Sequence, residues 1–271
     1  MLGMFTVITP AAYASCSRGL VGPAKSDRMW VDDQGSGPVT VVFESGNGND
    51  STVWDAITSR VRKLGVRTFA YDRAGLGRSD PAPAVYKVEA ELARLQRLLR
   101  LCRVTGPIVF VAHSYGGLLG LMTAANDKQV KAMVMVDAMV PGAMSAREIS
   151  NSVAKIRPDY AAFRREDPKR AGALIPLMEA MQTTRQRFEV TAISPTMPII
   201  DIVADRSTFK DSDPQSNAEW LKAHSDFVAY NPNREAVFAA GSGHKVMLDK
   251  PDIVVDAIGR MLGKLGFAPR R

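Results

Sequence analysis

A serine at the junction of an apolar run and a helix-compatible run is the strongest chemical signal in the chain. The β-favouring stretch 108–112 leads into His113-Ser114-Tyr115, and Leu118–Ala125 follows with helical composition. A strand, sharp turn and helix in this order, known as a nucleophile elbow, exposes the hydroxyl at the apex of the turn. It also places the next backbone N–H at a helix N-terminus, where developing negative charge is favoured. We therefore interpret Ser114 as a nucleophile and the Tyr115 amide as an oxyanion donor.

A serine hydroxyl needs a neighbouring base to become a nucleophile, and the chain has only three histidines. The His113 side chain should point to the opposite side of the turn, which favours a structural role. His224 lies in an amphipathic stretch without a partner motif, so we expect it to be at the surface or half-buried. His244 ends the glycine-rich loop Ala240-Gly241-Ser242-Gly243-His244, directly after the last expected strand. Ligands and catalytic groups gather at this edge of an open α/β sheet, so His244 is the expected base.

Alternating strands and helices must position these residues. Apolar or β-branched stretches predict strands at 28–35, 39–44, 66–71, 108–112, 132–136, 197–204 and 236–240. Helical patterns lie between them, among them 51–64, a stretch from Val88 to Leu99, 215–227 and 251–265. Continuous apolar strands separated by helices indicate an α/β fold, with a mostly parallel, doubly wound sheet that is covered on both faces.

The strand signal disappears between two halves of this pattern. We expect residues 141–194 to form a helical cap or lid, inserted into a core domain made of 24–140 and 195–271. Four methionines in or beside this insertion can line an adaptable apolar site or simply pack in the core: Met139, Met144, Met178 and Met181.

The first residues carry no fold signal, and we leave 1–23 outside the core as a leader or possible export signal. Met1–Ala14 has no charged side chain and ends in Ala12-Tyr13-Ala14, which resembles an export cleavage site, although a positive n-region is missing. The protein is exported or periplasmic if this segment is a truncated signal, and cytoplasmic otherwise. Cys16 and Cys102 fit no metal spacing and say little about the redox compartment.

Composition sets the broad class. The 271 residues are 46% apolar and 23% charged, as in a soluble globular protein, and no stretch approaches the roughly 20 apolar residues that span a bilayer. The net charge of +7 is scattered and accompanies no nucleic-acid motif, so we read it as a solvated surface. We expect a small-molecule substrate, no nucleic-acid partner, no stable membrane insertion, no metal and no cofactor; the sequence leaves the oligomeric state open.

From Arg28 to Phe267 the chain resembles the α/β-hydrolase superfamily, and in particular its serine esterases and lipases. Four motifs in the expected order carry the resemblance: Gly46-Asn47-Gly48, Asp72-Arg73-Ala74-Gly75-Leu76-Gly77-Arg78-Ser79, Ala112-His113-Ser114-Tyr115-Gly116 and Gly241-Ser242-Gly243-His244. The elbow has Ala112 where Gly is usual. The resemblance implies an α/β-hydrolase fold with a cap, and a catalytic triad in which Ser114 and His244 are two members.

The resemblance leaves the third member open. The commonest arrangement places the acid after the strand 199–204, where the usual slot falls on Ser207, with Asp205 close but offset and Asp211 further away. The other arrangement places it after the preceding strand, at Asp137, where an Asp can also merely cap a helix. We favour Asp137, because the carboxylate must reach the His ring.

The second oxyanion donor implied by the resemblance is the Asn47 amide. Many relatives have His-Gly before this donor, whereas this chain has Ser45-Gly46, which should alter the hydrogen bonds that hold the loop. Arg73, Arg78 and Asp80 are expected to fix the loop after the third expected strand, 66–71, and Glu44 to be a paired structural charge.

The activity implied is hydrolysis of a small to medium carboxylic ester through an acyl-enzyme. A non-hydrolytic enzyme of the same fold (a lyase or a cofactor-free perhydrolase) and a ligand-binding module are the alternatives. The glycines at 46 and 48 with Asp72 also imitate a dinucleotide fingerprint. Ser51 replaces the third glycine of that fingerprint, and the reading leaves Ser114 and His244 without a purpose, so we set it aside.

Overall fold

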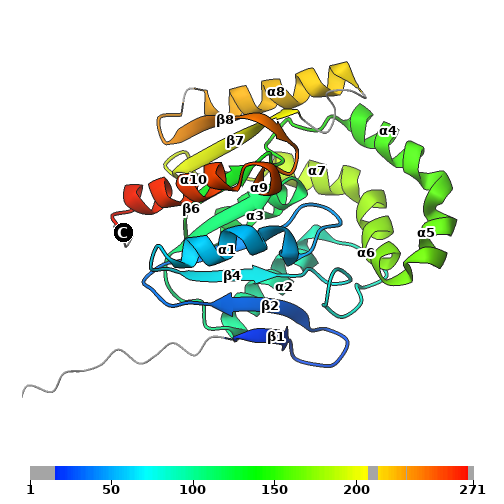
Figure 1. The fold of residues 1–271 in the computed structure, drawn as a ribbon. Helices are drawn as coiled ribbons and strands as arrows, with labels where there is room; N and C mark the ends of the chain where they lie inside the picture. The colour runs from blue at the N-terminus through cyan, green and yellow to red at the C-terminus, as the bar shows by residue number, and fades with distance from the viewer. Residues whose placement is uncertain (1–15, 207–212, 230, 268–271) are drawn as a thin grey trace, which may run out of the picture.

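The computed structural model describes residues 16–206, 213–229 and 231–267. A sheet of eight strands, ordered β1-β2-β4-β3-β5-β6-β7-β8, forms its centre (Figure 1). The strands are β1 Arg18–Val21, β2 Met29–Gln34, β3 Thr40–Glu44, β4 Arg67–Tyr71, β5 Ile108–His113, β6 Val130–Val136, β7 Ile199–Arg206 and β8 Arg234–Gly243. β2 is antiparallel to both of its neighbours, and every other pairing is parallel. The predicted α/β-hydrolase fold, a mostly parallel and doubly wound sheet, is confirmed.

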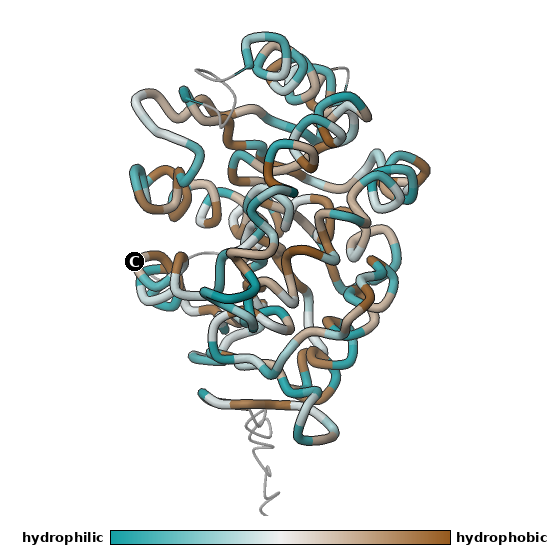
Figure 2. The backbone as a smooth tube through the Cα atoms, turned by 90° about the vertical axis from the view of Figure 1, so that its right-hand side faces the viewer, coloured by the Kyte–Doolittle hydropathy of each residue, from teal (hydrophilic) through white to brown (hydrophobic). Residues whose placement is uncertain are grey.

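Helices cover both faces of this sheet because its central strands are apolar on both sides. One face carries α1 (Asp55–Arg62), α9 (Val246–Asp249) and α10 (Pro251–Lys264). The other carries α2 (Val88–Leu101), α3 (Tyr115–Asn126) and α8 (Pro214–Val228). Hydrophobic and hydrophilic stretches alternate along the outer turns, as expected for amphipathic helices that turn one side toward the core (Figure 2). No helix in the described residues is long and apolar enough to cross a bilayer.

Between β6 and β7 the chain leaves the sheet and forms a group of helices. These are α4 (Ala146–Ile156), the short η2 (Arg157–Asp159), α5 (Tyr160–Glu166), α6 (Pro168–Glu179) and α7 (Met181–Glu189). They project to one side of the sheet in Figure 1. Pro158, Pro168 and Pro176, which punctuate this stretch of the sequence, fall in η2, at the first residue of α6 and inside α6. Side chains at one end of α6 reach Gly48 and Gly77, in the loops after β3 and β4.

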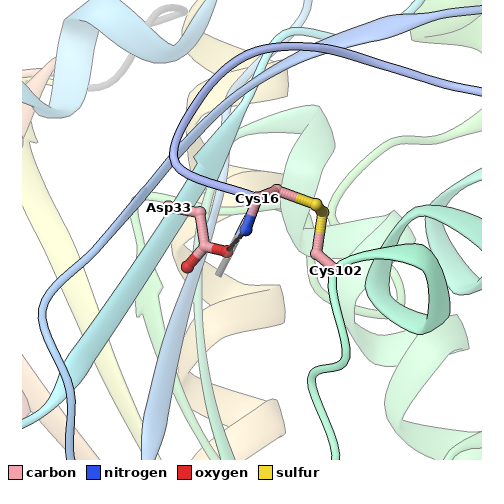
Figure 3. Close-up of side chains that lie close together, drawn as sticks. All are labelled: Cys16, Asp33 and Cys102. Carbon is pink, nitrogen blue, oxygen red and sulfur yellow. Dashed lines mark hydrogen bonds between the residues drawn. A yellow bond between two sulfur atoms is a disulfide. The ribbon is translucent and has the colours of Figure 1, made fainter. Parts of the chain in front are cut away.

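The N-terminal boundary needs a correction. β1 lies inside the range 1–23 that the sequence analysis left out of the fold, yet it pairs with β2 from Arg18 to Val21. A disulfide between Cys16 and Cys102 joins the start of β1 to the end of α2, and the Cys16 amide donates to Asp33 (Figure 3). Strand β1 has only four residues, Arg-Gly-Leu-Val, which is too short a stretch to show the apolar or alternating pattern that indicates a strand. Residues 1–15, which include the candidate export segment, lie outside the described residues.

Candidate active site

Ser114 occupies the sharp turn between β5 and α3. Its backbone has φ 52° and ψ −126°, in the left-handed half of conformational space where non-glycine residues are strained. Gly116 permits this turn, since a Cβ there would lie 2.7 Å from the Ser45 carbonyl oxygen and 2.8 Å from that of Glu44. Ala112 is fully buried in β5 and is accommodated with its methyl group. The local structure is therefore the expected elbow, with its serine at the N-terminus of a helix.

The loop after β3 approaches the elbow closely. A Cβ at Gly46 would lie 3.0 Å from the Ser114 Cβ and 2.6 Å from the His113 Nδ1, so only glycine fits at this position. This contact places Asn47 next to the elbow. Among the described residues, neither the backbone N–H of Asn47 nor that of Tyr115 donates a hydrogen bond to the protein, whereas the Asn47 side-chain amide donates to the Met178 sulfur. The site thus offers two free backbone donors, one from each segment.

His244 and Asp137 meet at the carboxyl edge of the sheet. His244 follows β8 directly, and Asp137 follows β6, with its amide bonded to the Ile202 carbonyl of β7. The His244 Nδ1 lies 2.6 Å from the Asp137 Oδ2, so Nδ1 carries the proton and donates it to the carboxylate. The Asp137 side chain is fully buried, whereas that of His244 is one-quarter exposed.

The Asp137 carboxylate is ionised. Burial opposes ionisation, but the His244 hydrogen bond and charge, with a hydrogen bond from the Ala204 amide, outweigh it and hold the pKa of Asp137 below its usual range. Asp205, the alternative acid, accepts a hydrogen bond from the Gly241 amide at 3.0 Å. The structure therefore places Asp137, and not Asp205, against the imidazole of His244. Ser207 and Asp211 lie outside the described residues.

His113 links the elbow to His244. Its Nε2 donates to the His244 carbonyl oxygen at 3.0 Å, and the two rings are 4.6 Å apart between centroids. Burial, followed by the charge of His244, lowers the pKa of His113 to about 3, so it stays neutral and keeps this donor role. The neighbour of Ser114 in sequence thus fixes the backbone of His244. Within the described structure, the Ser114 hydroxyl and the His244 ring are not hydrogen-bonded to each other.

Arg73 acts at a different place from the one expected. It was expected to fix the loop after β4, but its guanidinium donates to the carbonyl oxygens of Ser45 and Gly46 in the loop after β3. Glu44 is its buried counter-charge, as expected, and also accepts from the Tyr71 hydroxyl. Arg73 also lies 5.7 Å from the centre of the Tyr115 ring. One buried cation therefore contacts both segments that carry the free amides.

Two other features of the site were missed or misplaced by the sequence analysis. His224 is buried, not at the surface or half-buried, and its Nδ1 lies 2.7 Å from the buried carboxylate of Asp201. Trp220 donates its indole N–H to Asp137. A charged residue inside the apolar strand sequence Ile199-Ile200-Asp201-Ile202 was the available signal, because a buried carboxylate requires a partner.

The sequence model of the Alpha/beta hydrolase family matches residues 41–257. The chain belongs to the alpha/beta hydrolase family. The uncharacterized protein YqjL of Bacillus subtilis (strain 168) is 27% identical over 227 residues, which cover 83% of this chain and 84% of YqjL.

Solved structures agree with this membership at the level of fold. The haloalkane dehalogenase DatA of Agrobacterium tumefaciens C58 superposes with a TM-score of 0.68 at 18% identity, over 92% of this chain and 96% of DatA. A carboxylesterase structure from Nitrososphaera gargenis gives a TM-score of 0.67 at 17% identity, over 92% and 99% of the two chains. Identities this low indicate a shared fold and leave the substrate to the site itself.

Proposed function

We propose that the protein is a serine hydrolase that cleaves a carboxylic ester through an acyl-enzyme. The observation that carries this proposal is the hydrogen bond between His244 and the buried Asp137, next to a strained elbow with Ser114 at its apex. Asp137 keeps the proton of His244 on Nδ1 and leaves Nε2 free as a base. A hydroxyl, an imidazole and a carboxylate at one sheet edge suit acyl transfer.

In the proposed reaction, the Ser114 oxygen attacks the carbonyl carbon of the ester while His244 accepts its proton. The amides of Asn47 and Tyr115 hold the negative oxygen of the tetrahedral intermediate. His244 then gives its proton to the departing alkoxide, which leaves an ester between Ser114 and the acyl group. Water, deprotonated by His244, hydrolyses that ester and frees the acid. The serine hydroxyl argues against haloalkane or epoxide hydrolysis, because those reactions need a carboxylate at the elbow.

The substrate class is proposed from a cavity beside Asn47. It has a volume of about 310 Å³ and lies between Asn47 and helices α4, α5 and α6. These helices belong to the segment 141–194, which we propose forms the cap. Its other walls are mostly apolar, with one carboxylate from Asp159: Ile156, Tyr160, Phe163, Leu174, Ile175 and Met178. This volume is near the lower end of the range for small-molecule pockets. It suits a small to medium apolar acyl group whose carbonyl oxygen reaches the Asn47 amide.

Covalent labelling tests the nucleophile. A fluorophosphonate should label the wild-type protein stoichiometrically at Ser114, and Ser114→Ala should abolish labelling. Asp137→Asn should slow both labelling and ester turnover by up to about 10⁴, since the wrong tautomer of His244 is then favoured, whereas Asp205→Asn should leave both near wild type. Survival of activity in Asp137→Asn with collapse in Asp205→Asn would reverse the assignment of the acid.

Substrate profiling tests the reaction and the cavity. Turnover of p-nitrophenyl esters from acetate to decanoate should peak at a short or medium acyl chain. Leu174→Trp should move the optimum to shorter chains, because the indole fills the cavity. Stoichiometric labelling without ester turnover would point to a non-hydrolytic enzyme. A folded protein that is not labelled at all would point to a ligand-binding module.

A further inference from the structure

The Asp137 carboxylate has a donor that belongs neither to the sheet nor to His244. Its Oδ2 accepts from the His244 Nδ1 at 2.6 Å. Its Oδ1 accepts from the Ala204 amide at 3.1 Å and from the indole Nε1 of Trp220 at 3.2 Å. The tryptophan comes from α8, on the face of the sheet that carries α2 and α3. The position of this helix therefore bears directly on the carboxylate.

The Trp220 ring lies between two imidazoles. It is buried, and its centroid is 5.0 Å from that of His224 and 6.3 Å from that of His244, both in edge-to-face orientation. His224 is itself fixed by the Asp201 carboxylate of β7, one strand away from Asp137. Asp201 and His224 are both fully enclosed, so neither can touch a substrate. Instead, Asp201 fixes the ring of His224, and that ring packs edge-to-face against the indole of Trp220 and keeps it in this orientation.

We infer that Trp220 is a positioning residue, which fixes the Asp137 carboxylate so that its Oδ2 faces His244; this inference rests on the proposed function. The backbone of Asp137 has a φ of 40°, an unusual conformation for this residue. Rotation about the last side-chain bond of an aspartate is soft, so hydrogen bonds must set the plane of the carboxylate. Two donors on Oδ1 direct the other oxygen at the imidazole. Without the indole N–H, one amide remains to do this.

Trp220→Phe tests the inference, because it removes the N–H and keeps an aromatic ring against both imidazoles. The control is Trp30→Phe, since the Nε1 of Trp30 has no hydrogen-bond partner among the described residues. With p-nitrophenyl butyrate, Trp220→Phe should lower kcat about tenfold, the usual scale of a hydrogen bond to a charged group. KM should stay within about twofold, because the indole does not line the substrate cavity. Trp30→Phe should change neither constant.

A second measurement is independent of turnover. The proton on the His244 Nδ1 should give a low-field NMR signal in the wild type and in Trp30→Phe, and this signal should shift or broaden in Trp220→Phe. Should the Phe variant not fold, 3-benzothienylalanine at position 220 replaces the N–H with sulfur at nearly the same ring size and serves for both measurements.

The outcomes separate the two proposals. An unchanged kcat together with an unchanged low-field signal would overturn the role of Trp220, as would a loss that appears only in KM. Absence of labelling and of ester turnover in the wild type would instead overturn the proposed function. In that case the NMR signal still decides whether Trp220 orients Asp137.

Discussion

At the scale of single residues, the site concentrates unusual backbone geometry. Ser114 and Asp137 both have positive φ values, 52° and 40° respectively. Conformations of this kind cost of order 1–3 kcal/mol per residue and persist only where surrounding contacts enforce them. Here the enforcing contacts are visible: Gly117 and Met139 donate to the Ser114 carbonyl oxygen, and the Asp137 amide donates to Ile202.

The strain at Ser114 gives a testable consequence for stability. Ser114→Gly should raise the free energy of unfolding above that of Ser114→Ala by about 1–2 kcal/mol, because glycine adopts the turn conformation without a Cβ clash. Both variants should lose labelling and turnover. Urea unfolding of the two variants measures the difference. Equal stabilities would mean that the turn is not strained.

The residues of the site differ in how far the sequence could reveal them. Ser114 and His244 each lie in a short motif of small residues at the end of a strand, and such a local motif can be recognised from the sequence alone. Asp137 and Asp205 each follow a strand at the same edge, so only the contact between Asp137 and His244 distinguishes them. The sequence indicates that Asp201 needs a partner, because it lies in an apolar strand, but it does not identify that partner as His224, which is 23 residues away on α8.

At the scale of elements, loops after adjacent strands depend on one another. Arg73, after β4, holds two carbonyl groups of the loop after β3, which carries Asn47. The hydroxyl of Ser45 meanwhile donates to the Asp50 carbonyl and accepts from the Trp54 indole. Ser45 occupies the position where many relatives have His, and these bonds of its hydroxyl are the altered hydrogen bonds that the sequence predicted for this loop. The substitution of Ser45 was visible in the sequence, but the reach of Arg73 was not.

Arg73→Lys tests this dependence between loops. A lysine ammonium cannot reproduce the fork of donors that reaches Ser45, Gly46 and Glu44 together, so the Asn47 amide should lose its fixed direction. We expect kcat for p-nitrophenyl butyrate to fall by roughly 10- to 100-fold, somewhat less than for complete loss of an oxyanion donor. Arg78→Lys, whose partner is Asp72, is the control. Equal kcat values in the two variants would contradict the expectation.

Arg147 of α4 pairs with Glu219 of α8 and with Asp213 at the N-terminal cap of α8, and we expect this contact, next to Glu148, to depend on pH. Burial, followed by the charges of Glu219 and Asp213, raises the pKa of Glu148 to about 7. The unfolded chain releases this proton near pH 4.3, its ordinary pKa. Since the folded pKa lies above the unfolded one, stability is unaffected below about pH 4 and falls as the pH rises toward 7, beyond which the penalty is constant.

Glu148→Gln should therefore be more stable than the wild type above pH 7, by at most about 4 kcal/mol, and should show a flatter dependence of stability on pH. Glu166→Gln, an exposed position of α5, is the matched control. Thermal unfolding from pH 4 to pH 8 measures the difference. Parallel curves for wild type and Glu148→Gln would rule out this account.

At the scale of the whole molecule, the disulfide is the main feature that the sequence did not indicate. Two cysteines 86 residues apart carry no pairing signal, and they meet only because β1 joins the edge of the sheet. Asp33, which accepts the Cys16 amide, is also paired with the buried Arg67, and Arg67 donates to the Cys102 carbonyl. The bridge is thus embedded in a network that fastens the first strand to α2. The order of the other seven strands, by contrast, followed from apolar or β-branched stretches of the sequence.

Removing the bridge should destabilise the fold without disabling the site. Closing a loop of this length stabilises a protein by about 4–5 kcal/mol in the chain-entropy treatment, so Cys16→Ser combined with Cys102→Ser should lower the free energy of unfolding by that order. Wild-type protein in reductant should behave like the double variant, while its labelling rate at 25 °C stays unchanged. Identical unfolding curves with and without reductant would show that the disulfide is absent or does not stabilise the fold.

Because disulfides persist in oxidising compartments, we expect the chain to be recovered outside the cytoplasm, with its thiols blocked from alkylation. Fractionation followed by mass spectrometry of the Cys16 and Cys102 peptides is the check. Free thiols in freshly lysed cells would favour the cytoplasmic alternative.

The position of the cross-link along the chain also bears on biogenesis. Both sulfur atoms precede Ser114, whereas Asp137 and His244 emerge later from the ribosome or from an export channel. If the protein is exported, we therefore expect the disulfide to form on a nascent chain, before Asp137 and His244 have emerged. Under that alternative, the bond needs no separate step after the whole chain has folded.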